Sequence, residues 1–263
     1  MSQNQIYIFC IINTTCEINI RLGKYHIYSI PWRDISAVVT SFEKPVNMNT
    51  HIKKHALNHE RVVELMLNTN YTVLPMRLLT IVNNEENVLG ILKEYYGVFK
   101  DNFNRLSQKV EFGLKIIWPA EKIKEKISSS LIQSKENEIA PTDSPAMMSM
   151  KKKFKIYEIE KNIREEAEKY IKKIDEPLSE FIVEKKLQKL QTEKLLLNAS
   201  YLVEKSRQND IKQVFEKIKK DQPSLEYQFS GPWAPYNFIV MEKKKSSEEE
   251  SVMSNILDKI IKY

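Results

Sequence analysis

The chain has 263 residues, of which only five are glycine, and its net charge of +6 is the small excess of 41 basic over 35 acidic side chains. This length fits two modest domains or one large one. The shortage of glycine argues against glycine-rich phosphate loops, and the charge balance indicates a solvated surface more than a nucleic-acid footprint. The chain has only two cysteines, which predicts a reduced protein without disulfides. It shows no basic-plus-apolar leader and no apolar run near the ~20 residues that a membrane span needs, so we expect a cytoplasmic protein.

Residues 1–108 are expected to form a β-rich α+β domain. Apolar and β-branched runs predict strands, and Pro75 within the last of them favours an edge or a bulge. The expected strands are 5–12, 25–30, 35–40 and 73–80. Apolar residues at helical spacing predict one helix over 50–68 and a second that ends near Leu106. Asn83, with Glu86 three residues later, resembles a capping box that opens this second helix.

Residues 109–240 are expected to form the second domain, and they begin with a strand over 110–118. Polar, proline-containing residues 133–150 predict a mobile loop. Two helices should follow, the second opened by Pro177. The apolar positions assigned to these helices are Ile156, Ile163, Ala167, Tyr170 and Ile174, then Val183, Leu187 and Leu190.

Alternation then predicts strands over 195–203 and 225–229, with a helix over 211–218 between them. The order of strand, helices, strand, helix and strand resembles a ferredoxin-like unit with an inserted helical extension.

A tail, residues 241–263, is expected to hold a charged tether and a short amphipathic helix, Val252 to Ile261. Ile256, Leu257 and Ile260 lie on its apolar face and are candidate contact residues. A helix this short is marginal alone, so we expect it to pack across the seam between the two domains or to dock on a partner.

His51, His55 and His59 are four residues apart, so on a helix they lie along one side, as metal-binding histidines do. No complete ligand set accompanies them, and we expect no metal or other cofactor. Nor does a Gly-x-Ser-x-Gly motif or a neighbouring cysteine–histidine pair occur. Carboxylates on 165–173 alternate with lysines, which is typical of a solvated helix face. The sequence therefore predicts no enzyme.

Arg77 follows a proline in an apolar strand, where a charge costs free energy unless it is paired. A salt bridge that is buried or lies between domains is one interpretation, and a contact to a partner protein is the other.

The segment 231–238, Gly-Pro-Trp-Ala-Pro-Tyr-Asn-Phe, is the most distinctive in the chain. Its two prolines exclude a helix or the middle of a sheet, and its aromatic side chains are large and stiff. Trp233, Tyr236 and Phe238 are therefore candidates for a rigid corner or for a recognition surface.

Five further segments complete a resemblance: Ile-Tyr-Ile-Phe at 6–9, Ile-Ser-Ala-Val-Val at 35–39, His-Glu-Arg-Val-Val at 59–63, Thr-Val-Leu-Pro-Met-Arg at 72–77 and Glu-Phe-Gly-Leu-Lys at 111–115. Together with segment 231–238, and in this order, they resemble the GvpF/GvpL family of gas vesicle proteins over about 5–240. That family usually has a glycine shortly after the arginine, whereas Leu78 and Leu79 follow Arg77 here, which puts a close backbone approach in doubt.

The resemblance implies a gas vesicle accessory or minor structural protein that binds the small, very hydrophobic shell protein and other gas vesicle proteins. Such a chain would prevent aggregation of the shell protein, aid assembly or nucleation, and be found at the gas vesicle or in the cytoplasm. An assembly chaperone and a bound shell component both remain open. The alternative from another class is an RNA-binding ferredoxin-like module, although the RNP pattern is absent.

Overall fold

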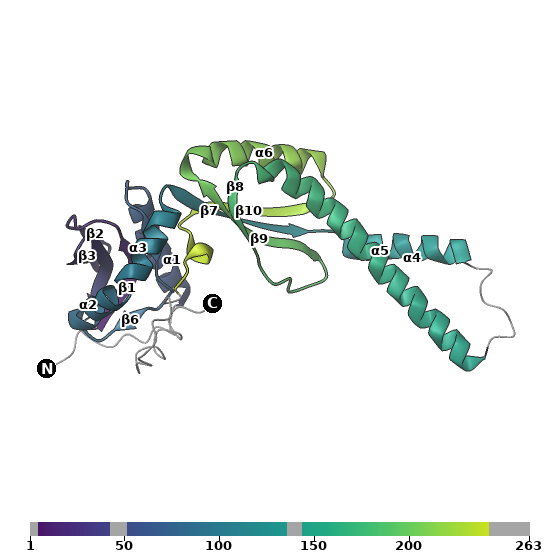
Figure 1. Cartoon of the computed structure of the whole chain (residues 1–263), viewed down its shortest axis with the longest axis horizontal. Helices are drawn as coiled ribbons and strands as arrows, with labels where there is room; N and C mark the ends of the chain where they lie inside the picture. Colours follow the sequence, from purple (N-terminus) through teal and green to yellow (C-terminus); the bar gives the residue numbers. More distant parts are fainter. Residues whose placement is uncertain (1–4, 43–51, 136–143, 242–263) are drawn as a thin grey trace. The chain divides into compact units, whose positions relative to one another are not determined.

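A computed structural model describes residues 5–42, 52–135 and 144–241 (Figure 1). Its contacts divide the chain into two units. Unit 1 contains the described residues up to Glu111 together with those from Gly231 on, and unit 2 is Phe112–Ser230. Residues 231–240, expected in the second domain, are thus grouped with the first. The predicted tail helix lies outside the described residues.

Unit 1 is built on a six-stranded sheet in the order β2-β3-β4-β1-β5, with β6 also paired to β1. Its strands are β1 (Gln5–Ile12), β2 (Asn19–Leu22), β3 (Tyr25–Trp32), β4 (Ile35–Phe42), β5 (Val73–Pro75) and β6 (Ile81–Val82). Its helices are α1 (Ile52–Leu67), α2 (Glu85–Glu94) and α3 (Tyr96–Leu106). Strands β1 and β4 are buried almost throughout, which is the burial that their uninterrupted apolar runs predict.

The core of unit 1 joins β1 to α1. Tyr7 and Phe9 pack in one cluster with Val62, Val63 and Met66 of the helix. On the hairpin between β3 and β4, the Asp34 carboxylate accepts hydrogen bonds from Tyr96 Oη and Lys100 Nζ, each at 2.6 Å. These bonds attach the first turns of α3 to the sheet.

Three expectations for unit 1 need correction. The helix that ends at Leu106 is two helices, separated at Tyr95. Its N-cap is Asn84, one residue later than expected, and Asn84 Oδ1 accepts from the Asn87 amide at 2.9 Å. The strand expected over 73–80 ends at Pro75, and it could not reach residue 80 because Leu79 has a φ of +69°, which an extended strand does not contain.

Unit 2 contains a four-stranded sheet in the order β10-β7-β9-β8. Its strands are β7 (Lys109–Ile117), β8 (Ile182–Leu187), β9 (Leu195–Glu204) and β10 (Glu226–Trp233), of which β7 begins and β10 ends in unit 1. Its helices are α4 (Ala120–Lys135), α5 (Pro145–Ser179) and α6 (Gln208–Asp221). Phe229 of β10 stacks on Phe112 of β7 and on Phe215 of α6, with ring centroids 5.2 and 4.2 Å away.

The prediction of a helix break at Pro177 is wrong. Helix α5 continues through Pro177 to Ser179, and the stretch with Val183 and Leu187 is the strand β8. A short apolar run fits both the helical and the strand period, and here pairing with β9 makes the segment a strand. Parts of the predicted loop 133–150 are helical instead: α4 includes 133–135, and α5 begins at Pro145, where Ser144 caps it through the Met147 amide.

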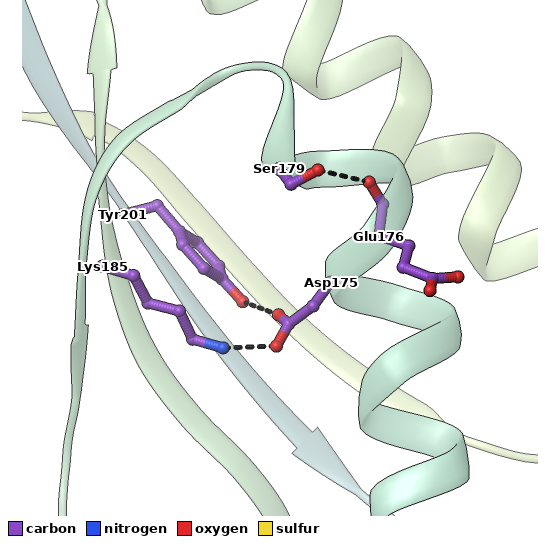
Figure 2. Close-up of polar contacts among 5 residues, drawn as sticks. All are labelled: Asp175, Glu176, Ser179, Lys185 and Tyr201. Atoms are coloured by element: carbon purple, nitrogen blue, oxygen red, sulfur yellow. Dashed lines mark hydrogen bonds and ion pairs between the residues drawn. The ribbon is translucent and has the colours of Figure 1, made fainter.

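The C-terminal end of α5 is fixed to the sheet by one carboxylate (Figure 2). Asp175 accepts hydrogen bonds from Lys185 Nζ on β8 at 2.5 Å and from Tyr201 Oη on β9 at 3.1 Å. Burial and the Asp175 charge raise the pKa of Tyr201, so the phenol keeps its proton and donates it. The N-terminal half of α5 extends well beyond the sheet of unit 2 (Figure 1).

Candidate functional site

Segment 231–241, which contains the sequence motif with two prolines, leaves β10 and packs within unit 1. Gly231 has a φ of +124°, a conformation that side chains other than hydrogen rarely allow, and the Gly231-Pro232 peptide bond is cis. The chain then makes a single 3-10 turn, η2 (Tyr236–Phe238). β10 is an edge strand, where a proline costs no ladder hydrogen bond to a neighbour.

Helix α3 binds the backbone of this segment. Asn102 Nδ2 donates to the Val240 carbonyl at 2.7 Å, and Asn102 Oδ1 accepts from the Val240 amide at 2.9 Å. Arg105 Nη2 donates to the carbonyl of Phe238. The Phe238 side chain is fully buried. It therefore anchors the segment in the core of unit 1 and presents no surface.

Two carboxylates bind the polar groups of the 3-10 turn. Glu111 accepts from the Asn237 amide at 2.9 Å and also from Asn237 Nδ2, and Glu111 is only 5% exposed. Hydrogen bonds to a charged group are the stronger kind, and these two satisfy a carboxylate that burial would otherwise penalise. Tyr236 Oη donates to Glu60 Oε2 of α1 at 3.1 Å. Burial raises the pKa of Glu60, and this hydrogen bond opposes the increase.

A small pocket of about 40 Å³ lies between β5, α3 and the returning segment. Arg77 and Tyr236, two of the residues singled out in the sequence, both line it. The other lining residues are Leu74, Pro75, Met76, Phe99, Ile239 and Met241. The pocket is thus mostly apolar, with one half-buried guanidinium and one phenol at its wall. Nearby along the chain, Trp233 is 38% exposed and Val240 44% exposed.

Four of the segments that carry the resemblance meet at this place. Segments 59–63, 72–77 and 111–115 supply Glu60, Arg77 and Glu111. Segment 231–238 forms hydrogen bonds with Glu60 and Glu111 and lines the same pocket as Arg77. We name this surface the return-segment site: residues 231–241 with Arg77 and the α3 residues that hold them.

Sequence reasoning missed Asn102 and Arg105. Asn102 is a buried amide in the middle of a helix, where asparagine is a poor helix former, and that mismatch is the signal that could have identified it. Ile256, Leu257 and Ile260 lie outside the described residues and stay predicted contact residues.

The histidines do not assemble a metal centre in the described parts of the chain. His59 is buried, and its Nδ1 forms a hydrogen bond with Tyr7 Oη, 2.7 Å away. Its Nε2 faces the Met76 backbone without a hydrogen bond of ordinary geometry. His51 lies outside the described residues, and no three His, Cys, Asp or Glu of the described ranges are grouped to hold an ion.

No helix in the described ranges is long and apolar enough to cross a membrane. The aromatic rings of the unit 2 sheet up to Phe229 are at least half-buried, and Phe112 and Tyr201 are fully buried. They therefore form no open stacking platform of the kind that RNA-binding sheets present.

The chain is similar to known proteins in both sequence and fold. Residues 5–240 match the family model "Gas vesicle synthesis protein GvpL/GvpF". Gas vesicle protein F of Haloferax mediterranei is 24% identical over 85% of this chain and 86% of its own length. Gas vesicle protein L1 of Halobacterium salinarum is 20% identical over 89% and 90%. The crystal structure of GvpF from Anabaena sp. PCC7120 is 20% identical and superposes with a TM-score of 0.76 over 91% of this chain and all of that one.

Proposed function

Because the chain belongs to the GvpL/GvpF family of gas vesicle synthesis proteins, we propose that it binds the hydrophobic gas vesicle shell protein and keeps it from aggregating before assembly. The role is that of an accessory or minor structural protein and involves no catalysis. It is compatible with a transient assembly chaperone in the cytoplasm and with a component that stays on the vesicle shell.

The observation that carries this proposal is the return-segment site. A soluble binder of an apolar protein needs exposed apolar and aromatic side chains on a rigid support. Trp233 and Val240 provide such side chains. Asn102 fixes the backbone of Val240, and Arg105 and Glu111 fix the backbone of Phe238 and Asn237 between the two. The adjacent pocket can take an apolar side chain, and Arg77 can bind a backbone carbonyl or carboxylate of the shell protein.

Co-expression with the shell protein tests the proposal. Wild-type chain should raise the soluble fraction of the shell protein and retain it in a pull-down, whereas equal aggregation with and without the chain would refute the anti-aggregation role. Trp233→Ser should weaken retention at least several-fold. Leu190→Ser is the matched control, because Leu190 is likewise an exposed apolar residue, at 51%, but belongs to unit 2. Equal loss in both variants would place the binding elsewhere.

We also propose that unit 2 is a ferredoxin-like domain extended by α4 and α5. Its elements follow the order strand, helices, strand, strand, helix, strand, and its strands lie in the order β10-β7-β9-β8. This arrangement supports the split βαβ class. Many members of that class bind RNA, but the packed aromatics of this sheet favour the protein-binding role. RNA binding that weakens steeply with salt would restore the alternative.

A further inference from the structure

The chain that pairs with β1 as β5 and then as β6 leaves the sheet between these two strands. The Met76 amide donates to the Phe9 carbonyl at 2.9 Å, and the Ile8 amide donates to the Thr80 carbonyl, also at 2.9 Å. Two adjacent residues of β1 therefore hold both ends of an excursion, residues 77–79, which we name the Arg77 turn. Because both ends are fixed, a change in one backbone angle of the turn must be compensated by the other residues of the turn.

Thr80 closes the Arg77 turn from the inside. Its amide donates to the Arg77 carbonyl at 3.2 Å, and its Oγ1 donates to the same carbonyl at 2.7 Å. Thr80 is buried, so both donors act in a shielded environment, where a hydrogen bond is electrostatically stronger than in water. The carbonyl of Arg77 is thereby fixed, and the backbone angles of the turn set the direction in which the Arg77 side chain leaves the chain.

The turn contains a strained residue. Leu79 has a φ of +69°. In this left-handed conformation the Cβ of any residue except glycine lies too close to the following carbonyl oxygen, so leucine adopts it only at a cost in free energy. The Leu79 side chain is half-buried and packs against the core cluster of unit 1 that contains Phe9 and Val62. Strain of this kind persists only where the surrounding contacts impose it.

A buried phenol supplies a contact that imposes the strained conformation. Tyr7 Oη accepts from the Leu79 amide at 3.2 Å and so takes the place that a neighbouring strand has for an amide inside the sheet. The same Oη forms a hydrogen bond with His59 Nδ1 on α1, 2.7 Å away, and both residues are only 3% exposed. Burial raises the pKa of Tyr7, so the phenol keeps its proton. Two consecutive hydrogen bonds thus link α1 through β1 to Leu79.

We propose that Tyr7, oriented by His59, is a positioning residue for Arg77. Its hydroxyl holds Leu79 in the left-handed conformation, and because the turn is fixed at both ends, that conformation places the Arg77 side chain at the wall of the pocket in the return-segment site. Tyr7 is not among the residues that line this pocket, so it acts through the turn. The inference rests on the function proposed for this site, in which Arg77 binds a backbone carbonyl or carboxylate of the shell protein.

Tyr7→Phe tests the proposal because it keeps the ring in the core and removes only the hydroxyl. In NMR spectra of the full-length chain, hydrogen exchange of the Leu79 amide should accelerate by at least about tenfold, while the amides of β4 keep their wild-type rates. The side-chain Nε–H signal of Arg77, assigned by its loss in Arg77→Lys, should shift in the same variant. Tyr201→Phe removes a buried phenol oxygen from unit 2 and should change neither signal. An unchanged Leu79 amide and Arg77 signal in Tyr7→Phe would overturn the proposal.

Two substitutions of Leu79 separate backbone strain from side-chain packing. Leu79→Gly and Leu79→Ala both remove the large apolar side chain, but only glycine adopts a φ near +69° without strain. In the Tyr7→Phe background, Leu79→Gly should therefore restore the wild-type Arg77 signal, and Leu79→Ala should not. Equal Arg77 signals in the two double variants would overturn the proposal.

Retention of the shell protein in the pull-down separates this inference from the proposed function. Tyr7→Phe and Arg77→Ala should each reduce retention at least several-fold, and the double variant should be no worse than Arg77→Ala alone, because Tyr7 acts through Arg77. Additive losses would show that Tyr7 supports binding in another way and would overturn the proposal. If the wild-type chain retains no shell protein, the proposed function fails, and the Leu79 and Arg77 signals still decide the positioning role of Tyr7.

Discussion

His59 couples the stability of unit 1 to pH. Burial lowers its pKa to about 4, well below the value of about 6.5 for an exposed histidine. Below pH 6.5 the unfolded chain binds a proton at this position that the folded chain does not bind. The stabilisation is therefore complete above pH 6.5 and is lost as the pH falls towards 4.

Replacing His59 by glutamine should remove this dependence, since glutamine can still form a hydrogen bond with Tyr7 but does not titrate in this range. Between pH 7.5 and 4.5, we expect the wild-type free energy of unfolding to fall by about 2.5 kcal/mol more than that of His59→Gln. Urea denaturation at both pH values measures the difference. His26→Gln, at an exposed histidine, is the control and should follow the wild type. Equal pH dependence of wild type and His59→Gln would contradict the prediction.

Asn102 is the residue on which the return segment most depends. It satisfies both backbone groups of Val240, and in Asn102→Ala these groups lose their partner in a half-buried setting. The loss should lower the free energy of unfolding by about 2 kcal/mol. Asn104→Ala changes the same residue type on the exposed face of α3 and should cost nothing or stabilise slightly. Chemical denaturation of the two variants measures their free energies of unfolding. Equal values would show that the Asn102 amide does not stabilise the fold.

Among the elements, the junction of α5 with β8 and β9 depends on Asp175. Asp175→Asn keeps an acceptor for Tyr201 but removes the charge that Lys185 pairs with. Because both side chains of this ion pair are more than two-thirds buried, the expected loss is about 1–2 kcal/mol, more than for a surface pair. Amide hydrogen exchange should accelerate in β8 first. The neighbouring Glu176→Gln breaks only an exposed pair with Lys172 and should change little.

Hydrophobic periodicity predicted the elements whose pattern fits only one type of secondary structure. The alternation of 195–203 and the apolar run of 5–12 became β9 and β1. Periodicity failed at β8, where the pattern fits both a helix and a strand and pairing with a neighbouring strand determines the structure. It also left α4 unassigned, because this helix is only weakly amphipathic and contains several serines.

The return-segment site shows the same limit. Arg77, Trp233 and Tyr236 were singled out because their residue types are unusual in context, and they stay predicted contact residues. Asn102 was not, because its partner Val240 is 138 residues away along the chain and no local pattern reports such a contact.

For the molecule as a whole, the chain order within the units makes unit 2 an insertion in unit 1. A chain that ends at Ser230 lacks Phe238 and leaves Asn102, Arg105 and Glu111 without the groups they bind. We expect unit 1 to lose its hydrogen-exchange protection in this variant while the amides of β9 stay protected. A chain that ends at Met241 is the control and should keep unit 1 folded. Protection of β1 and α3 in both truncated chains would contradict this prediction.

The same insertion sets an order of events on the ribosome. All of 112–230 is synthesised before the first residue of the return segment, so unit 2 can fold while unit 1 still lacks its last structural piece. The pocket lined by Arg77 is completed by Tyr236, Ile239 and Met241, which are among the last described residues to be translated. The pocket at which we propose that an apolar protein binds is therefore incomplete until residue 241 has been translated.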